Sequence, residues 1–266
     1  MRNPLLEDLE AGRTSLGLWV NSADMVDLCG YVGFRWVMID QMFSSHDWHQ
    51  TSALITAAEA AEITPVVRIQ SNPWLGYDHR IAPDVARAIG VGAQFMLVSH
   101  SEKREIDECV VAARDWHRKG LVIHRGRESA EGRSEPAHQG RSYVIPQPET
   151  QGGLDSLEEI IADPEIHIVF IAMSDASRII SDSEQPDFYN ERLWEYVDRA
   201  VELGRRHGVT IGANTSYAYT LDEMRKRVIM LHERGVRMIM LQGVNFIFQI
   251  VAEQLLADLR PVLASG

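Results

Sequence analysis

Short apolar segments rich in Val, Ile, Leu and Phe recur along the whole of this 266-residue chain. Segments with helical patterns lie between them, and such alternation is compatible with only a few fold classes. Strands joined by helices run parallel, and strands that are apolar along their whole length are buried on both faces. The predicted strands are Ser15–Val20, Trp36–Asp40, Pro65–Ile69, Phe95–Ser99, Tyr143–Pro146, Ile168–Ala172, Val209–Ala213 and Met238–Gln242.

The segments between these strands predict helices. Eight strands in a chain of this length indicate a (β/α)₈ TIM barrel, a fold of about 250 residues. An open, doubly wound sheet alternates in the same way, but it often has a glycine-rich phosphate turn after its first strand. Here residues 21–24 contain no glycine, so we expect a single TIM-barrel domain over residues 1–266. The predicted helices include Asp47–Glu62, Asp84–Ile89, Glu102–His117, Leu154–Ala162, Asn190–His207 and Leu221–Arg234.

One segment, residues 125–141, lacks apolar periodicity and consists mainly of Gly, Ser, Glu and Arg. Loops of this length within a compact domain are usually lids, binding loops or disordered segments. We expect a long mobile loop here. The alternative is a solvated insertion without a function.

The C-terminal segment from about Asn245 to Arg260 predicts an amphipathic helix with a wide apolar face. A helix that is apolar over so much of its circumference usually packs between two surfaces. We therefore expect this helix to form a subunit interface, and the alternative is the ordinary closing helix of a barrel. The apolar face consists of Phe248, Val251, Ala252, Leu255, Leu256 and Leu259, widened by Phe246, Ile247 and Ile250.

The chain is acidic, with 26 Lys and Arg against 38 Asp and Glu and a formal net charge of −12. Nucleic-acid-binding proteins need clustered cations, so this balance argues against that class. Cys29 and Cys109 lack the spacing of a metal or redox motif, which favours two buried thiols in a reducing compartment. Neither a signal peptide nor a membrane-spanning segment is indicated. We expect a cytoplasmic protein that binds neither nucleic acid nor a membrane.

Barrel enzymes carry their reactive side chains where the strands end, so polar residues just after each predicted strand are the candidates for chemistry. Glu149 and Asp175 follow neighbouring strands in the predicted order and have few cations near them in the sequence. Two carboxylates form the oxygen-rich half-site that Mg²⁺ or Mn²⁺ prefers. The alternative is that each carboxylate caps a helix or a turn.

Arg68 stands near the end of the third predicted strand. An arginine stays charged and presents a planar fork, which suits the oxygens of a 2-oxo acid and of the enolate derived from it. The alternative is a salt bridge to a neighbouring carboxylate such as Asp40. The two roles are compatible with one another.

Five short motifs occur in order along the chain: Gly17–Leu18–Trp19, Trp36–Val37–Met38–Ile39–Asp40, Pro65–Val66–Val67–Arg68, Gln147–Pro148–Glu149–Thr150 and Val169–Phe170–Ile171–Ala172–Met173–Ser174–Asp175. In this order and at these intervals, the sequence resembles the HpcH/HpaI aldolase family. These are the class II pyruvate aldolases, which are related to macrophomate synthase and more distantly to the citrate lyase β-subunits. The resemblance spans nearly the whole chain.

The resemblance implies a metal-dependent aldolase barrel that forms a homo-oligomer. Commonly this is a hexamer, a trimer of dimers, in which C-terminal helices are exchanged between protomers. By position, Glu149 and Asp175 would hold a divalent ion, either Mg²⁺ or Mn²⁺, with Co²⁺ as a further option, and Arg68 would stabilise a pyruvate enolate. The residues that would bind the pyruvate moiety are Trp19, Gln147 and Ser174.

The chain departs from the family pattern after Asp40. Family members usually place a Glu and a proton-moving His in this loop, whereas the corresponding residues here are Met42 and Phe43. His46, three residues further along, is the candidate replacement, supported by Asp40 or Asp47, because an imidazole titrates near neutral pH. Its alternative role is that of an exposed residue at the start of a helix.

We therefore expect a divalent-metal-dependent carbon–carbon lyase that cleaves or forms a 4-hydroxy-2-oxo acid through a pyruvate-type enolate, with a 2-oxo acid and an aldehyde as its partners. His100, after the fourth predicted strand, is a further acid–base candidate. No lysine ends a predicted strand, which argues against an imine mechanism. Two alternatives stay open: decarboxylation or carbon–carbon hydrolysis on the same scaffold, and a non-catalytic barrel that binds a 2-oxo acid or a partner protein.

Overall fold

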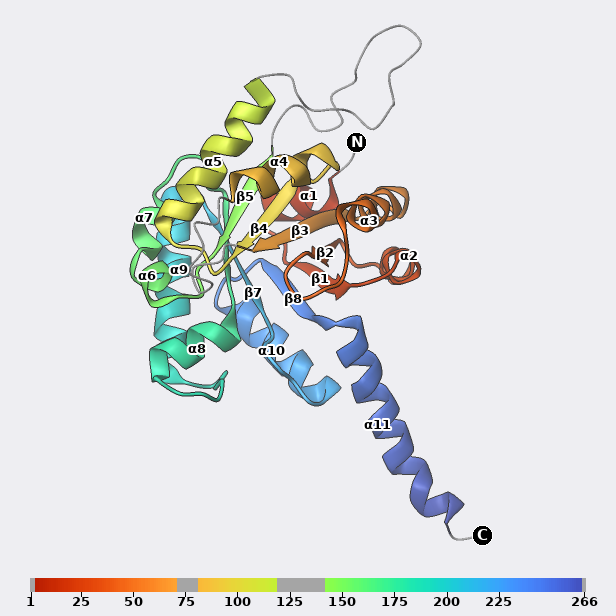
Figure 1. Cartoon of the computed structure of the whole chain (residues 1–266). Helices are drawn as coiled ribbons and strands as arrows, with labels where there is room; N and C mark the ends of the chain where they lie inside the picture. Colours follow the sequence, from red (N-terminus) through yellow and green to blue (C-terminus); the bar gives the residue numbers. More distant parts are fainter. Residues whose placement is uncertain (1–2, 71–80, 119–141, 265–266) are drawn as a thin grey trace, which may run out of the picture.

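The computed structural model describes residues 3–70, 81–118 and 142–264, so the predicted loop at 125–141 lies outside the described residues. At its centre is a barrel of parallel strands (Figure 1). The strands are β1 (Ser15–Val20), β2 (Trp36–Asp40), β3 (Thr64–Gln70), β4 (Phe95–Ser99), β5 (Tyr143–Gln147), β6 (Ile168–Ile171), β7 (Thr210–Asn214) and β8 (Met238–Gly243).

The strands pair in the order β5-β4-β3-β2-β1-β8-β7-β6, and each of these pairs is parallel. β5 and β6, at the two ends of this order, contact one another, so the eight strands form a nearly closed barrel. The predicted α/β fold of the TIM-barrel type is confirmed. Each predicted strand lies within one residue of its observed ends.

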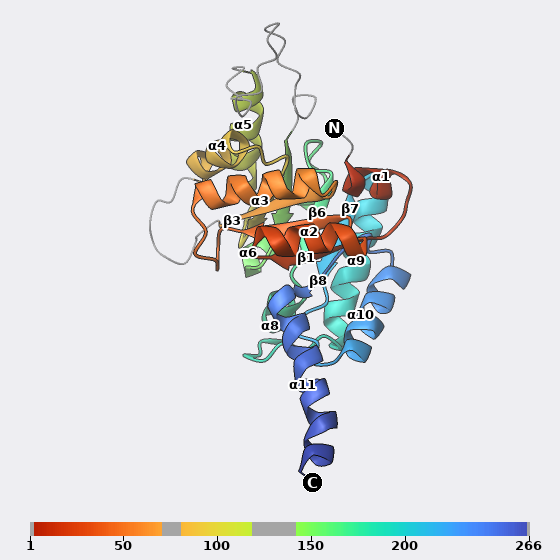
Figure 2. The ribbon, with the colours of Figure 1, turned by 90° about the vertical axis from the view of Figure 1, so that its right-hand side faces the viewer.

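Helices surround the barrel on its outside (Figures 1 and 2). Among the described residues, no helix is long and apolar enough to cross a membrane. The helices are α1 (Pro4–Glu10), α2 (Ala23–Val32), α3 (Trp48–Ala60), α4 (Ala82–Gly90), α5 (Lys103–Arg118), α6 (Gln151–Asp155), α7 (Leu157–Ile161), α8 (Met173–Ser181), α9 (Glu191–His207), α10 (Leu221–Glu233) and α11 (Val244–Leu263).

Two helical regions differ from the sequence prediction. The segment predicted as one helix over Leu154–Ala162 forms α6 and α7 instead, and α6 begins earlier because the Thr150 hydroxyl accepts the Gly153 N–H at 3.0 Å. The sequence did not predict α8, whose first two turns include residues 174–177. That helix lacks a side-chain cap, since Ala172 is its N-cap residue. Its start therefore carries no sequence signal of the usual kind.

Large apolar side chains fill the inside of the barrel. Trp36 is fully buried among them, and a Cβ on Gly17 would lie 2.3 Å from its ring. Leu5 of α1 belongs to the same cluster, and its N–H donates to Thr64 Oγ1 at 3.1 Å, at the start of β3. α1 therefore closes the barrel at the amino ends of the strands. The cluster consists of Leu5, Trp36, Met38, Val66, Phe95, Leu97, Ile145, Ile168, Phe170, Met238 and Met240.

α11 runs away from the barrel rather than along it (Figures 1 and 2). The alternative prediction of an ordinary closing helix is therefore wrong, because much of the apolar face is exposed. A contiguous exposed apolar face of this kind marks an interaction surface. The exposed residues are Phe246, Phe248, Val251, Leu255, Leu256, Leu259 and Leu263, which we call the α11 apolar face.

Candidate active site

The carboxyl ends of the strands bring most of the predicted site residues to one face of the barrel. Asp40 and Gln147 are the last residues of β2 and β5, and Arg68 lies two residues before the end of β3. Glu149 and Ser174 closely follow β5 and β6. All five side chains are buried. Because the carboxyl ends of parallel barrel strands open on the same face, these residues surround one site.

Asp40 holds Arg68 in place. Arg68 Nε donates to Asp40 Oδ1 at 2.7 Å, which is the salt bridge that the sequence suggested. The N–H groups of Met42 and Phe43 donate to the two Asp40 oxygens at 2.9 and 3.0 Å. Arg68 Nη2 and Gln147 Oε1 are buried without a hydrogen-bond partner among the described residues. Since unpaired buried polar atoms are unfavourable, both atoms are suited to a polar ligand.

Among the described residues, two aromatic rings lie beside the Arg68 guanidinium. The distance from Arg68 Cζ to the ring centroid is 5.3 Å for Trp19 and 5.2 Å for Phe43. At such distances the negative face of an aromatic ring attracts a cation. Trp19 therefore lies at the arginine, and its contact with a substrate stays a prediction.

Glu149 is buried next to Asp175. Glu149 Oε2 accepts the His100 N–H at 2.9 Å, and His100 Nδ1 lies 3.6 Å from the same oxygen. Burial and the negative charge of Asp175 raise the pKa of Glu149 to about 8. Asp175 is less buried and accepts a hydrogen bond from Arg178 Nη1 at 2.9 Å. The charge of Asp175 thus disfavours the charged form of the buried Glu149 carboxyl.

These two carboxylates fit a divalent cation. A hard cation relieves the repulsion between neighbouring carboxylates, and their oxygens are ligands that Mg²⁺ and Mn²⁺ prefer. The sequence left open that Glu149 caps the following helix, but the N-cap residue of α6 is Thr150. In the described part of the chain, no group of three or more His, Cys, Asp or Glu side chains is arranged to hold a metal. A cation at Glu149 and Asp175 would therefore take further oxygens from water or substrate.

His100 has a backbone conformation that is uncommon for a residue with a side chain. Its φ of 51° lies in the left-handed region,, and this conformation directs its N–H at Glu149. Burial lowers the pKa of the imidazole, and this effect prevails over the opposing charge of Asp175, with Arg68 lowering the pKa further. The sequence indicated His100 only as a histidine at a strand end, without its backbone role.

The His46 ring contacts the segment that follows β1. Its Nε2 is 3.1 Å from the Asn21 carbonyl oxygen. Asp47 accepts the Gln50 N–H at 2.7 Å and caps α3. Among the described contacts, none joins the His46 ring to Asp40 or Asp47. The acid–base role of His46 stays a prediction.

Ser174 contacts Ser216, a residue that the sequence did not single out. The Ser174 and Ser216 hydroxyl oxygens are 2.7 Å apart, and Asn214 Oδ1 accepts the Met173 N–H at 3.1 Å. Gln242 Nε2 donates to two carbonyl oxygens of the β7–α10 loop at 3.0 and 2.8 Å. No local pattern marks Ser216, because its partner lies 42 residues away.

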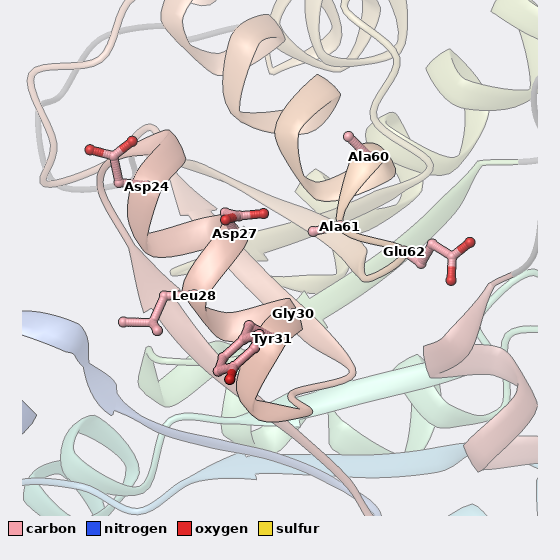
Figure 3. A pocket seen from close by; sticks show the side chains of 8 residues that line it. All are labelled: Asp24, Asp27, Leu28, Gly30, Tyr31, Ala60, Ala61 and Glu62. Carbon is pink, nitrogen blue, oxygen red and sulfur yellow. The ribbon is translucent and has the colours of Figure 1, made fainter.

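A surface pocket lies elsewhere, between α2 and the end of α3 (Figure 3). The residues at the end of α3 that line this pocket directly precede β3. The pocket therefore lies towards the amino ends of the strands, away from Arg68 and Glu149. It is not formed by any predicted site residue. Its lining consists of Asp24, Asp27, Leu28, Gly30, Tyr31, Ala60, Ala61 and Glu62.

Residues 15–241 match the HpcH/HpaI aldolase/citrate lyase family. The chain belongs to this family. The matched range includes every predicted site residue, from Trp19 to Asp175. The resemblance found in the sequence is thereby confirmed, and the protein is an enzyme of an aldolase and lyase family.

Individual relatives are distant. A hydroxypyruvate/pyruvate aldolase of Deinococcus radiodurans is 29% identical over 188 residues, which are 66% of this chain and 64% of that protein. One from Roseovarius nubinhibens is 26% identical over 222 residues, 78% of this chain and 81% of that protein. An HpcH/HpaI family structure from Burkholderia cenocepacia has a TM-score of 0.77 at 22% identity, covering 97% of this chain and all of that one. That structure shows the shared fold alone.

Proposed function

We propose that this protein is a divalent-metal-dependent aldolase that forms or cleaves a 4-hydroxy-2-oxo acid. One observation carries the proposal: an oriented arginine with a buried, unpaired Nη2 shares a site with two neighbouring carboxylates, Glu149 and Asp175. An arginine fork and a hard cation are complementary to the oxygens of a 2-oxo acid. Family membership and relatives named hydroxypyruvate/pyruvate aldolases support the same reaction class.

Glu149 and Asp175 would hold the cation, Mg²⁺ or Mn²⁺ by their hard oxygen ligands, with Co²⁺ as an alternative. Such an ion, when bound, supplies a Lewis acid that polarises the 2-oxo carbonyl. Gln147, with its unpaired Oε1, and Ser174 would orient the 2-oxo acid. Trp19 would contact the substrate beside Arg68.

The reaction requires one carbon–carbon bond to break or form. In the cleavage direction, the C4 hydroxyl loses its proton, the C3–C4 bond breaks, and C4 becomes the carbonyl carbon of the aldehyde. The electron pair stays with C3 as the enolate of pyruvate, and C3 then takes up a proton. Arg68 Nη2 would donate to the oxygen that gains negative charge, and burial strengthens this interaction. Asp40 keeps the guanidinium in that orientation.

The carboxylate pair provides the test. Glu149→Gln and Asp175→Asn remove one negative charge each while preserving shape. Substitution of a residue that only hydrogen-bonds to a metal ligand weakens metal binding or activity about 10–100-fold. Loss of a direct ligand should cost more. We therefore expect each variant to lower the rate of metal-dependent C3 proton exchange of pyruvate by at least about a hundredfold. Proton NMR in D₂O measures the exchange, and calorimetric titration with Mn²⁺ measures cation binding.

Glu159→Gln is the matched control, since Glu159 is an exposed carboxylate on α7. It should leave both exchange and Mn²⁺ affinity unchanged. Exchange at the wild-type rate in Glu149→Gln or Asp175→Asn would refute the assignment of the site.

We also propose that the α11 apolar face packs against other copies of the chain, as in a hexamer with exchanged C-terminal helices. The supporting observations are the exposure of this face and the direction of α11 away from its own barrel. Such a helix gains its apolar burial only from a partner.

A further inference from the structure

An aromatic side chain is presented at the mouth of the proposed site by the β2–α3 loop. Phe43 is 68% exposed. Its ring nevertheless lies 5.2 Å from Arg68 Cζ, and its N–H is bonded to Asp40 Oδ2. A single exposed Phe is unremarkable on a protein surface. This one is anchored to the two residues at the centre of the site.

The residues on either side of Phe43, Met42 and Ser44, contact the barrel strands. The Ser44 hydroxyl donates to the Asp40 carbonyl oxygen. The Ser99 hydroxyl, at the end of β4, lies 3.2 Å from Met42 Sδ. Directly after the loop, a capping box fixes the first turn of α3. An aromatic surface held in this way loses little conformational entropy when a ligand covers it.

The same region is unfavourable for a charged acceptor. Residues 41–45 of the loop are uncharged. Among the described residues beside the site, Arg68 and Arg178 already pair with carboxylates.

We propose that the acceptor aldehyde carries an apolar substituent, aromatic or branched aliphatic, and that Phe43 selects it by contact with this substituent. This inference rests on the proposed aldolase function. In the bond-forming direction, C3 of the enolate attacks the aldehyde carbon, the carbonyl π electrons move to oxygen, and that oxygen takes up a proton. The reacting carbons must approach to about 3–3.5 Å. With the 2-oxo acid on Arg68, the substituent then lies within reach of the Phe43 ring.

The test compares benzaldehyde with glycolaldehyde and with succinate semialdehyde in aldol addition of pyruvate. The measured quantity is the ratio of kcat/KM for benzaldehyde to kcat/KM for each polar aldehyde. A substitution at Phe43 that disturbs Arg68 would change kcat/KM for all three aldehydes alike. Such an effect therefore does not change the ratio. The variants are Phe43→Ser, which removes the apolar contact, and Phe43→Leu, which retains part of it. Tyr31→Ser is the matched control, because Tyr31 is 88% exposed on α2 and belongs to the separate pocket.

We expect wild-type protein and Tyr31→Ser to favour benzaldehyde. A hydrophobic contact with a substrate is worth about 10–200-fold in specificity, so the ratio should fall at least about tenfold in Phe43→Ser and less in Phe43→Leu, mainly through KM. A wild-type preference for either polar aldehyde, or an unchanged ratio in Phe43→Ser, would overturn the inference while leaving the aldolase proposal intact. Absence of metal-dependent pyruvate proton exchange in the wild type would instead overturn the proposed function itself.

Discussion

The carboxylate of Asp40 receives three hydrogen bonds, from Arg68 Nε and from the N–H groups of Met42 and Phe43. It is fully buried. Hydrogen bonds to both of its oxygens fix the orientation of this carboxylate,. Asp40 thus acts as a positioning residue for Arg68 and for the backbone of the loop that carries Phe43.

Gly17 allows the Trp36 ring to pack closely inside the barrel. Gly17→Ala would place a methyl group 2.3 Å from the ring of Trp36, and the ring is fully buried within the barrel. Overpacking of this kind typically lowers stability by about 1–3 kcal/mol. We expect a loss of at least that size in the free energy of unfolding, measured by urea denaturation followed by tryptophan fluorescence.

Gly90→Ala is the control for this substitution. No heavy atom lies within 4 Å of a Cβ at Gly90, at the end of α4. A glycine replaced without strain leaves stability unchanged or raises it by less than about 1 kcal/mol. Equal stability of Gly17→Ala and wild type would contradict the packing described for Trp36.

At the scale of elements, α1 is attached to the barrel by charge as well as by Leu5. Asp8 of α1 accepts hydrogen bonds from Arg13 Nη2 at 2.8 Å and from Arg35 Nε at 3.0 Å. Burial by itself would raise the pKa of Asp8, but the hydrogen bonds from the two arginines outweigh it and hold the pKa below the ordinary value. Arg35 directly precedes β2, so this carboxylate joins α1 to the amino end of the barrel.

The lowered pKa of Asp8 predicts a pH-dependent contribution to stability. A group whose pKa is lower in the folded state stabilises that state above its unfolded pKa, and the contribution is lost as the pH falls through the folded pKa. Because both arginines are partly exposed, we expect Asp8→Asn to destabilise the protein by only about 1 kcal/mol at pH 7. The difference from wild type should shrink below the ordinary pKa of 3.8.

Urea denaturation at a series of pH values from neutral to acidic measures this difference. Glu10→Gln, an exposed site on the same helix, should show no pH-dependent difference. If Asp8→Asn were destabilising by the same amount at every pH, the carboxylate charge would not be the cause.

For the whole molecule, the exposed α11 apolar face allows a test of the proposed assembly. Leu255→Glu would place a charge on the α11 apolar face, where Leu255 is 55% exposed in the single chain. Burying an unpaired carboxylate in an interface is strongly unfavourable, so we expect this variant to form smaller species than wild type. Sedimentation velocity measures the change.

Glu253→Gln is the control for assembly, because Glu253 lies on the same helix and is also exposed. It should sediment like wild type, and circular dichroism should show that Leu255→Glu keeps its helix content. A wild-type protein that sediments as a monomer would contradict the proposed role of α11.

The barrel itself was predictable, because each strand is buried on both faces and so appears as a continuous apolar run. Helices were harder to predict where the first turn lacks a capping side chain, as at Ala172 before α8. Within the site, the sequence indicated Arg68, Asp40, Gln147 and Glu149 because each stands at a strand end. Their bonding partners could not be predicted in the same way. The Ser174–Ser216 contact and the backbone conformation of His100 have no local signature.

Sequence alone was sufficient to predict the α/β class, the eight strands, the family and the chemical types available at the strand ends, because periodicity and residue chemistry are local properties. The folded arrangement of the chain was needed to show that Asp40 orients Arg68, that Glu149 lies buried beside Asp175, and that the Phe43 ring lies over the arginine. It also decided that α11 leaves its own barrel. These features depend on distances between residues far apart in the chain, and such distances arise only when the barrel closes.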